Sequence, residues 1–107
     1  MVVETPIGKD AFRKQLDDAG EKLVVVDFFA TWCHPCKVMG PKFEKMSYEY
    51  GNKAVFIKID IDAEEEVSDD YDINVMPTFI LLKNGKPIAR IEGNVPEELR
   101  KAIASNL

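Results

Sequence analysis

The segment Leu23–Phe29, LVVVDFF, limits the folds open to this chain more than any other. Its β-branched and aromatic residues run on without the polar alternation of a strand that has one face in water. We therefore predict a strand buried on both faces, which requires a covering layer on each side of its sheet. Asp27 is the one charged residue in the run, and a buried carboxylate is costly unless it is neutralised or paired.

Helical and strand patterns alternate along the rest of the chain, with no repeat or linker between them. The residue spacing predicts helices over residues 8–19, 34–50 and 63–71 and from Pro96 onward, and strands over residues 23–29, 54–59, 78–82 and 87–92, with a further short strand at residues 2–3. The pair Asn84-Gly85 predicts a tight hairpin turn between the last two strands. We expect an α/β protein with a central mixed sheet of four to five strands, flanked by four helices, in a single domain spanning residues 1–107.

The helices carry apolar faces that should point towards the core. The spacing assigns Val38, Met39, Phe43, Met46 and Tyr50 to the face of the second helix, and Leu99, Ile103 and Leu107 to the face of the last one. Gly20 and Gly51 follow the first two helices, where glycine is typical of a helix end.

The chain carries 19 acidic and 14 basic residues, a net charge of −5. This balance argues against nucleic acid as a partner, because phosphate backbones need a basic surface. Much of the negative charge lies in residues 60–72, which we interpret as a solvated helix and loop, with charge complementarity to a partner as the alternative. The most apolar segment is too short to span a bilayer, and the first twenty residues do not resemble a signal peptide. We therefore expect no membrane association and a cytoplasmic location.

Both cysteines and the only histidine lie in the segment WCHPC, where the strand 23–29 passes into the helix 34–50. The predicted helix begins at or just after Cys33, so its free N–H groups and positive dipole end stabilise a Cys33 thiolate. Cys36 lies about one turn further along and can attack a mixed disulfide formed on Cys33. We predict that Cys33 is the attacking nucleophile and Cys36 the resolving thiol of a redox pair.

Two other interpretations of the cysteine pair remain open. A structural zinc site needs four ligands, and His34 is the only further Cys or His in the chain, so we expect no metal unless two chains share a site. Two inert core cysteines are the second alternative, and a strand-to-helix corner argues against it.

Asp27 is the candidate for proton transfer. Desolvation inside the sheet should raise its pKa towards neutrality. A carboxyl group with that pKa could accept the proton of Cys36, directly or through one water molecule. The alternative is a solvated aspartate at a strand end.

The segments ATWCHPCK, MPTF, KNG and VVDF, together with Gly93, resemble the thioredoxin family in order and spacing over essentially the whole chain. The resemblance implies the thioredoxin fold and a general protein-disulfide reductase that binds no cofactor of its own. It also implies recharging with electrons from NADPH by a separate flavoprotein, thioredoxin reductase, and disulfide-containing proteins as targets.

The resemblance further assigns roles to single residues. Lys58 would approach and tune Asp27, although a plain exposed strand lysine is the alternative. Met76–Pro77 would be a cis peptide bond, with the Met76 backbone pairing with an extended target, although simple strand entry would also account for the proline. The family's docking patch corresponds here to Trp32, Pro35, Met76, Pro77 and Gly93, beside an exposed thiol, with a core role as the alternative for Trp32.

Two residues depart from the family pattern. Glu92 is one of them, because an apolar or small residue is usual nearby, and it bears on the size of the docking patch. His34 stands where the family usually has glycine, and we assign redox tuning to His34 and Pro35, the two residues between the cysteines. A protonated His34 would favour the Cys33 thiolate and make the disulfide a stronger oxidant, whereas an exposed residue of no consequence is the alternative.

The expected function is that of a monomeric protein-disulfide reductase working through Cys33 and Cys36. A disulfide oxidase or isomerase is the alternative within the same chemistry. A redox-independent binding subunit is the alternative outside it, because the fold alone does not dictate function.

Overall fold

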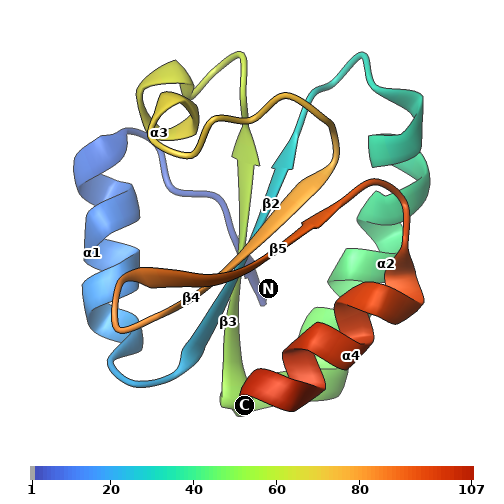
Figure 1. The fold of residues 1–107 in the computed structure, drawn as a ribbon. Helices are drawn as coiled ribbons and strands as arrows, with labels where there is room; N and C mark the ends of the chain where they lie inside the picture. The colour runs from blue at the N-terminus through green and yellow to red at the C-terminus, as the bar shows by residue number, and fades with distance from the viewer. Residues whose placement is uncertain (1) are drawn as a thin grey trace.

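Five strands form one mixed sheet in the computed structural model, which describes residues 2–107 (Figure 1). The strands are β1 Val3–Glu4, β2 Leu23–Phe29, β3 Ala54–Asp60, β4 Thr78–Lys83 and β5 Lys86–Glu92, and they lie in the order β1-β3-β2-β4-β5. The first three in that order run parallel, whereas β4 is antiparallel to β2 and β5 is antiparallel to β4. The predicted mixed sheet is confirmed, with five strands.

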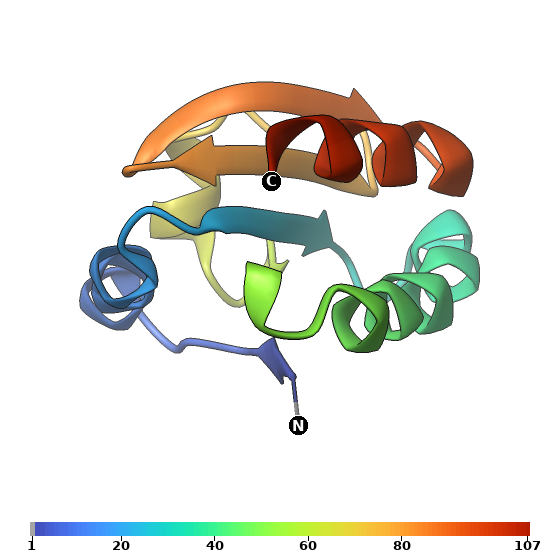
Figure 2. The same ribbon diagram turned by 90° about the horizontal axis from the view of Figure 1, so that it is seen from below.

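Four α-helices cover the two faces of the sheet, as predicted (Figures 1 and 2). They are α1 Lys9–Ala19, α2 His34–Tyr50, α3 Glu65–Asp69 and α4 Pro96–Asn106, and a short 3₁₀-helix, η1 Gly51–Lys53, follows α2. One apolar layer joins the sheet to α1 and α3, and the other joins it to α2 and α4.

The strand β2 is buried on both faces, as its sequence predicts. Val25 belongs to the layer beneath α2 and α4, whereas Val24 and Val26 belong to the layer beneath α1 and α3. Both edges of β2 are also paired, with β3 on one side and β4 on the other. Asp27 therefore lies in the middle strand of the sheet and shares the face of Val25.

The predicted turns and helix ends are confirmed. Asn84 and Gly85 both have positive φ angles, 53° and 77°, as a two-residue hairpin turn of type I′ requires. Gly20 and Gly51 follow α1 and α2 with positive φ angles of 60° and 53°. The short strand expected at residues 2–3 is observed one residue later, as β1.

Three predictions about the helices are wrong. The acidic helix expected over residues 63–71 is shorter, because only Val67 and Ser68 of α3 are buried. Val38 is 38% exposed, because it lies outside the row formed by the buried residues of α2. Leu107 is 46% exposed, because α4 ends one residue before it.

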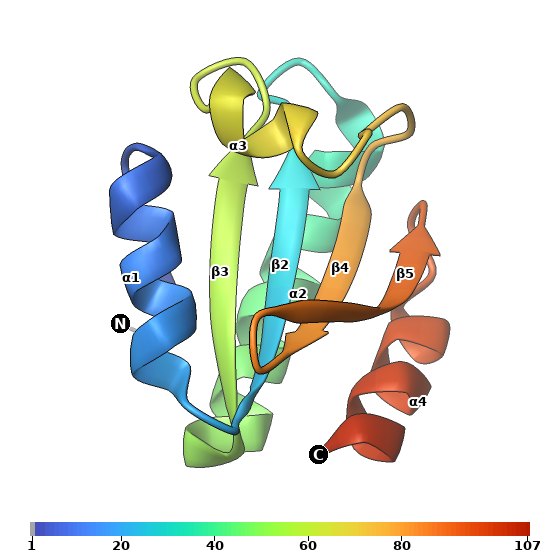
Figure 3. The ribbon, with the colours of Figure 1, turned by 60° about the vertical axis from the view of Figure 1, so that its left-hand side comes forward.

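The fold brings the ends of several strands and the start of one helix to the same edge of the sheet (Figure 3). The carboxyl ends of β2 and β3, the first turn of α2 and the segment that enters β4 all meet there. In open α/β sheets this edge is where functional groups gather. None of the helices within residues 2–107 has the length and apolar character needed to cross a bilayer.

Candidate active site

The two cysteines lie at the start of α2. Cys33 is the residue that caps the helix, as predicted, and its Sγ accepts a hydrogen bond from the Cys36 backbone N–H at 3.2 Å. The same sulfur lies 3.6 Å from the carbonyl oxygen of Met76, to which the thiol can donate. Both cysteines are free thiols. The helix terminus thus directs an N–H group at the Cys33 sulfur, where negative charge is favoured.

Cys33 is only 6% exposed, so the prediction of an exposed thiol is wrong. It forms a small buried cluster with Ala30 and Cys36, against which Met76 packs. Met76 lies 43 positions further along the chain than Cys33, so the residue pattern around the cysteines does not predict that Met76 covers them. The neighbouring Trp32 is 65% exposed.

Cys36 differs from Cys33 in its surroundings. Burial raises the pKa of the Cys36 thiol to about 12, and a hydrogen bond with Cys33 adds to the rise, while a backbone hydrogen bond with Ala30 opposes it. Cys36 is therefore a thiol near neutral pH and needs a base before it can attack.

A carboxyl group lies beneath the thiols, on the face of β2 that α2 covers. Asp27 is 2% exposed, and its Oδ1 has no hydrogen-bond partner within residues 2–107. Burial raises the pKa of Asp27 to about 7, against a smaller lowering by the positive charge of Lys58. The alternative of a solvated aspartate at a strand end is therefore wrong.

Lys58 is the register partner of Asp27 on the neighbouring strand β3. It faces away from Ile57 and Ile59, which pack into the opposite layer, as the alternation predicts. Its Nζ lies 4.6 Å from the centre of the Phe29 ring. The lysine thus lowers the pKa of Asp27 through its charge, with no ion pair between the two within residues 2–107.

An open cavity of about 400 Å³ joins these groups, since Asp27, Cys36 and Lys58 all line it. Gly40 and Glu44 of α2 also line it. A water molecule occupies about 30 Å³ in the liquid, so the cavity has room for water between the carboxyl group and the thiol. The carboxyl group of Asp27 and the thiol of Cys36 thus share one cavity that is open to solvent.

The segments assigned to target docking also meet at this edge. The Met76–Pro77 bond is cis, as the resemblance implies. The Gly93 N–H donates to the Pro77 carbonyl at 2.8 Å, which joins the two segments. Pro77 itself is buried, whereas Met76 and Gly93 are partly exposed. Pro35 and His34 are exposed on the first turn of α2.

Two residues at this edge, Asp60 and Asp62, have roles that the sequence analysis did not predict. The Trp32 Nε1–H donates to Asp62 Oδ2 at 2.9 Å, so one acidic residue of the 60–72 segment holds the tryptophan side chain. Asp60 shapes that loop, because its Oδ1 accepts the backbone N–H of Asp62 at 3.0 Å. The only available signal is that Asp62 follows the strand next to β2.

A pair of free thiols one helical turn apart, with a buried carboxyl group beneath them, defines a thiol–disulfide exchange protein. Within residues 2–107, no three His, Cys, Asp or Glu side chains are arranged to hold a metal ion. The family model described as thioredoxin matches residues 3–105, and the chain belongs to the thioredoxin family.

Individual relatives agree. The chain is 46% identical to thioredoxin-1 of Schizosaccharomyces pombe over 102 residues, which cover 88% of this chain and 98% of that protein. It is 42% identical to the thioredoxin of Homo sapiens over 95 residues, or 89% of this chain and 90% of that protein. Among solved structures, reduced Schistosoma mansoni thioredoxin pre-protein matches with a TM-score of 0.94 at 36% identity, over 100% of both chains.

These relationships give the protein its general activity. It is a protein-disulfide oxidoreductase of the thioredoxin type, with a redox-active cysteine pair. Proteins of this family work without a bound cofactor, so the chemistry rests on the chain's own thiols.

Proposed function

We propose that Cys33 attacks the disulfide of a target protein, that Cys36 resolves the mixed disulfide, and that Asp27 takes the proton of Cys36. The observation that carries this proposal is the difference between the two thiols. The Cys33 sulfur accepts an N–H group at the helix terminus, whereas burial raises the pKa of Cys36 to about 12.

The reaction balances as two exchanges. The Cys33 thiolate forms a bond with one target sulfur, and the other target sulfur leaves and takes up a proton. Cys36 then gives its proton to Asp27 as its sulfur attacks Cys33 Sγ, so the mixed disulfide breaks and the second target sulfur leaves as a thiolate, which takes up a proton from solvent. The target gains two electrons, and the Cys33–Cys36 pair becomes the disulfide.

The residues around the pair have supporting roles in this proposal. Lys58 tunes Asp27 by its charge, since it lowers the pKa that burial raises. Trp32, Met76 and Gly93 form the docking surface, on which an extended target segment pairs with the Met76 backbone, and the buried Pro77 supports it from beneath. His34 and Pro35 tune the redox potential.

A separate thioredoxin reductase returns the disulfide to the dithiol with electrons from NADPH, through its own flavin. The partners are thus this reductase and disulfide-containing target proteins, with neither nucleic acid nor a membrane among them. The chain acts as a single-domain monomer in the cytoplasm. The similarity to known thioredoxins and the net charge of −5 support these assignments.

The test is NADPH oxidation in the presence of thioredoxin reductase and insulin as the disulfide substrate. Wild-type protein should sustain turnover. Cys33→Ser should abolish it, whereas Cys36→Ser should stop after trapping the target in a mixed disulfide. Turnover that survives Cys33→Ser would contradict the assignment of the nucleophile.

Two outcomes would favour the alternatives. A Cys33–Cys36 disulfide that oxidises glutathione readily at equilibrium would indicate an oxidase or isomerase. Full biological activity after replacement of both cysteines by serine would indicate a binding subunit.

A further inference from the structure

The segment that carries Met76 is weakly held by its own backbone. Residues 71–77, here called the 71–77 loop, connect α3 to β4 without regular structure. Outside helices and strands, the backbone–backbone hydrogen bonds within residues 2–107 include none from residues 72–76. The position of this loop therefore depends on side chains.

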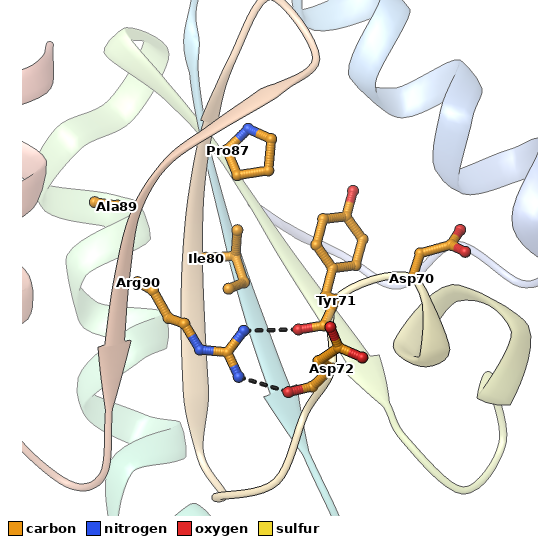
Figure 4. Close-up of a pocket in the computed structure, with 7 residues that line it drawn as sticks. All are labelled: Asp70, Tyr71, Asp72, Ile80, Pro87, Ala89 and Arg90. Atoms are coloured by element: carbon orange, nitrogen blue, oxygen red, sulfur yellow. Dashed lines mark hydrogen bonds between the residues drawn. The ribbon is translucent and has the colours of Figure 1, made fainter.

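A cavity of about 400 Å³ lies between the start of the loop and the strands β4 and β5 (Figure 4). Tyr71 borders it on the loop side, and Ile80 and Pro87 border it on the sheet side. Side-chain packing thus leaves a gap where the loop passes over the sheet.

Arg90 of β5 bridges this gap (Figure 4). Its Nη1 donates to the Tyr71 carbonyl at 2.6 Å, and its Nη2 donates to the Asp72 carbonyl at 2.7 Å. One planar guanidinium group therefore holds two successive carbonyls, a geometry that the single ammonium group of lysine cannot reproduce.

Glu92 fixes the arginine from the other side. The Arg90 Nε donates to Glu92 Oε2 at 3.2 Å, so three nitrogens of one side chain are engaged. Glu92 directly precedes Gly93, whose N–H donates to Pro77 at the far end of the loop. The loop is thus tied to β5 at its start through Arg90 and at its end through Gly93.

We propose that Arg90, oriented by Glu92, is a positioning residue that sets the target affinity by holding the 71–77 loop, and with it Met76, against β5. This inference rests on the proposed function, in which the Met76 backbone pairs with the target. Arg90 touches neither cysteine nor target. Its contribution is to reduce the conformational freedom that the loop would lose when a target binds.

The simpler explanation for the position of Arg90 is a surface ion pair with Glu92. Their side chains are 35% and 44% exposed, and pairs of that kind contribute little by themselves. The two carbonyl contacts favour the proposal over a simple ion pair. They join β5 to the 71–77 loop, whereas Arg90 and Glu92 are neighbours on one strand.

The test compares two substrates in single-turnover reactions of the pre-reduced protein. Insulin presents a peptide segment to Met76, whereas the small aromatic disulfide dithiobisnitrobenzoate presents none. Arg90→Met should raise the half-saturating insulin concentration about five- to tenfold, with the maximal rate within about twofold of wild type. The rate with the small disulfide should stay within about twofold.

The matched control is Arg100→Met. Arg100 also bonds a glutamate, Glu49, and its side chain is 27% exposed, but it lies on α4 and its side chain forms no hydrogen bond or ion pair with the 71–77 loop within residues 2–107. This variant should leave the half-saturating insulin concentration unchanged. An equal effect of both substitutions would reduce Arg90 to a general contribution to stability and overturn the proposal.

Two further variants keep the test decisive if Arg90→Met folds poorly. Arg90→Lys keeps the positive charge but loses the planar guanidinium group that bonds two carbonyls, so its insulin affinity should lie between those of Arg90→Met and wild type at best. Glu92→Gln keeps both carbonyl contacts and should lower the insulin affinity less than Arg90→Met does. Hydrogen exchange at the Gly93 amide, which donates to the Pro77 carbonyl at the end of the loop, should be faster in Arg90→Lys than in wild type.

The outcomes separate this proposal from the proposed function. Wild-type protein that reduces neither substrate would contradict the proposed function. Active wild type with unchanged insulin affinity and unchanged amide exchange in the Arg90 variants would contradict the role of Arg90 alone. Equal losses with insulin and with the small disulfide would likewise overturn it.

Discussion

Asp27 carries a carboxyl group into the centre of the sheet, where β2 is paired on both edges and covered on both faces. A buried group of this kind, with Oδ1 lacking a partner within residues 2–107, opposes folding. Burial of Asp27 nevertheless places a base next to Cys36. Near pH 7 the carboxyl group is divided between its two protonation states, as a base that must accept and release a proton requires.

Replacing this base should slow the second exchange. In Asp27→Ala, Cys36 must lose its proton to solvent, while burial still raises the pKa of its thiol. We expect the mixed disulfide to persist at least about tenfold longer at pH 7. Rapid acid quenching followed by mass measurement gives its lifetime, and a lifetime equal to that of wild type would refute the role of Asp27.

His34 should set the potential of this member of the family. It is exposed on the first helical turn beside Cys33, where an imidazolium favours the thiolate and so the reduced form. We expect a potential about 10–40 mV less reducing than in His34→Gly, at about 30 mV per 1.4 kcal/mol. Equilibration with glutathione measures it, and equal potentials from pH 6 to 8 would rule it out.

The sequence predicts a residue's place where the cause is local. The helix start at Cys33 follows from the strand-to-helix corner, and the direction of Lys58 follows from alternation with its neighbours. The cover of Met76 over Cys33 and the bond from Trp32 to Asp62 could not be predicted in this way. Both join segments at least 30 positions apart, and their pairing depends on which loops meet at the sheet edge.

At the scale of elements, the sequence predicted the position of an element correctly where its residue pattern allows only one structure, and incorrectly where the pattern allows more than one. The strand β2 and the hairpin at Asn84-Gly85 lie as predicted, because burial on two faces and positive φ angles restrict the residues that can occupy them. The helix α3 is shorter than its acidic sequence suggests. Its charged residues tolerate either helix or loop in water, so only the buried Val67 and Ser68 mark its extent.

Two glycines in these elements should respond oppositely to the same substitution. Gly85→Ala should destabilise the protein by about 1 kcal/mol, because φ is 77° there although nothing lies within 4 Å of an added Cβ. Gly40→Ala should stabilise it by about 0.5–1 kcal/mol, because Gly40 lies inside α2 and an added Cβ meets nothing within 4 Å apart from its chain neighbours and the backbone of the helix. Urea unfolding measures both, and shifts of the same sign would contradict the reasoning.

At the scale of the whole molecule, the reactive groups occupy one edge of the sheet, while the two apolar layers lie between the sheet and its helices. Asp27 is the exception, because it reaches from the reactive edge into the layer beneath α2. The stability of the whole fold is thereby coupled to one proton.

This coupling predicts how stability changes with pH. Burial raises the pKa of Asp27 from 3.8 to about 7, so between these values the folded state keeps a proton that the unfolded state has lost. The contribution of Asp27 to the free energy of unfolding should therefore fall as the pH rises from about 4 to 7. At about 1.4 kcal/mol per pH unit, the loss is about 4 kcal/mol.

Asp27→Ala should lack this loss. The variant should be more stable than wild type at pH 8, and the advantage should disappear towards pH 4, where the carboxyl group is neutral in both states. Urea unfolding at several pH values provides the measurement. Parallel pH profiles for the two proteins would contradict the coupling.

The order of strands also has a consequence for synthesis on the ribosome. β2 is made early, but both of its neighbours, β3 and β4, are made later, and the second is complete only at Lys83. The apolar run of residues 23–29 therefore emerges long before the strands that cover its edges. The nascent chain must keep this segment from pairing with other chains until most of the protein has left the ribosome.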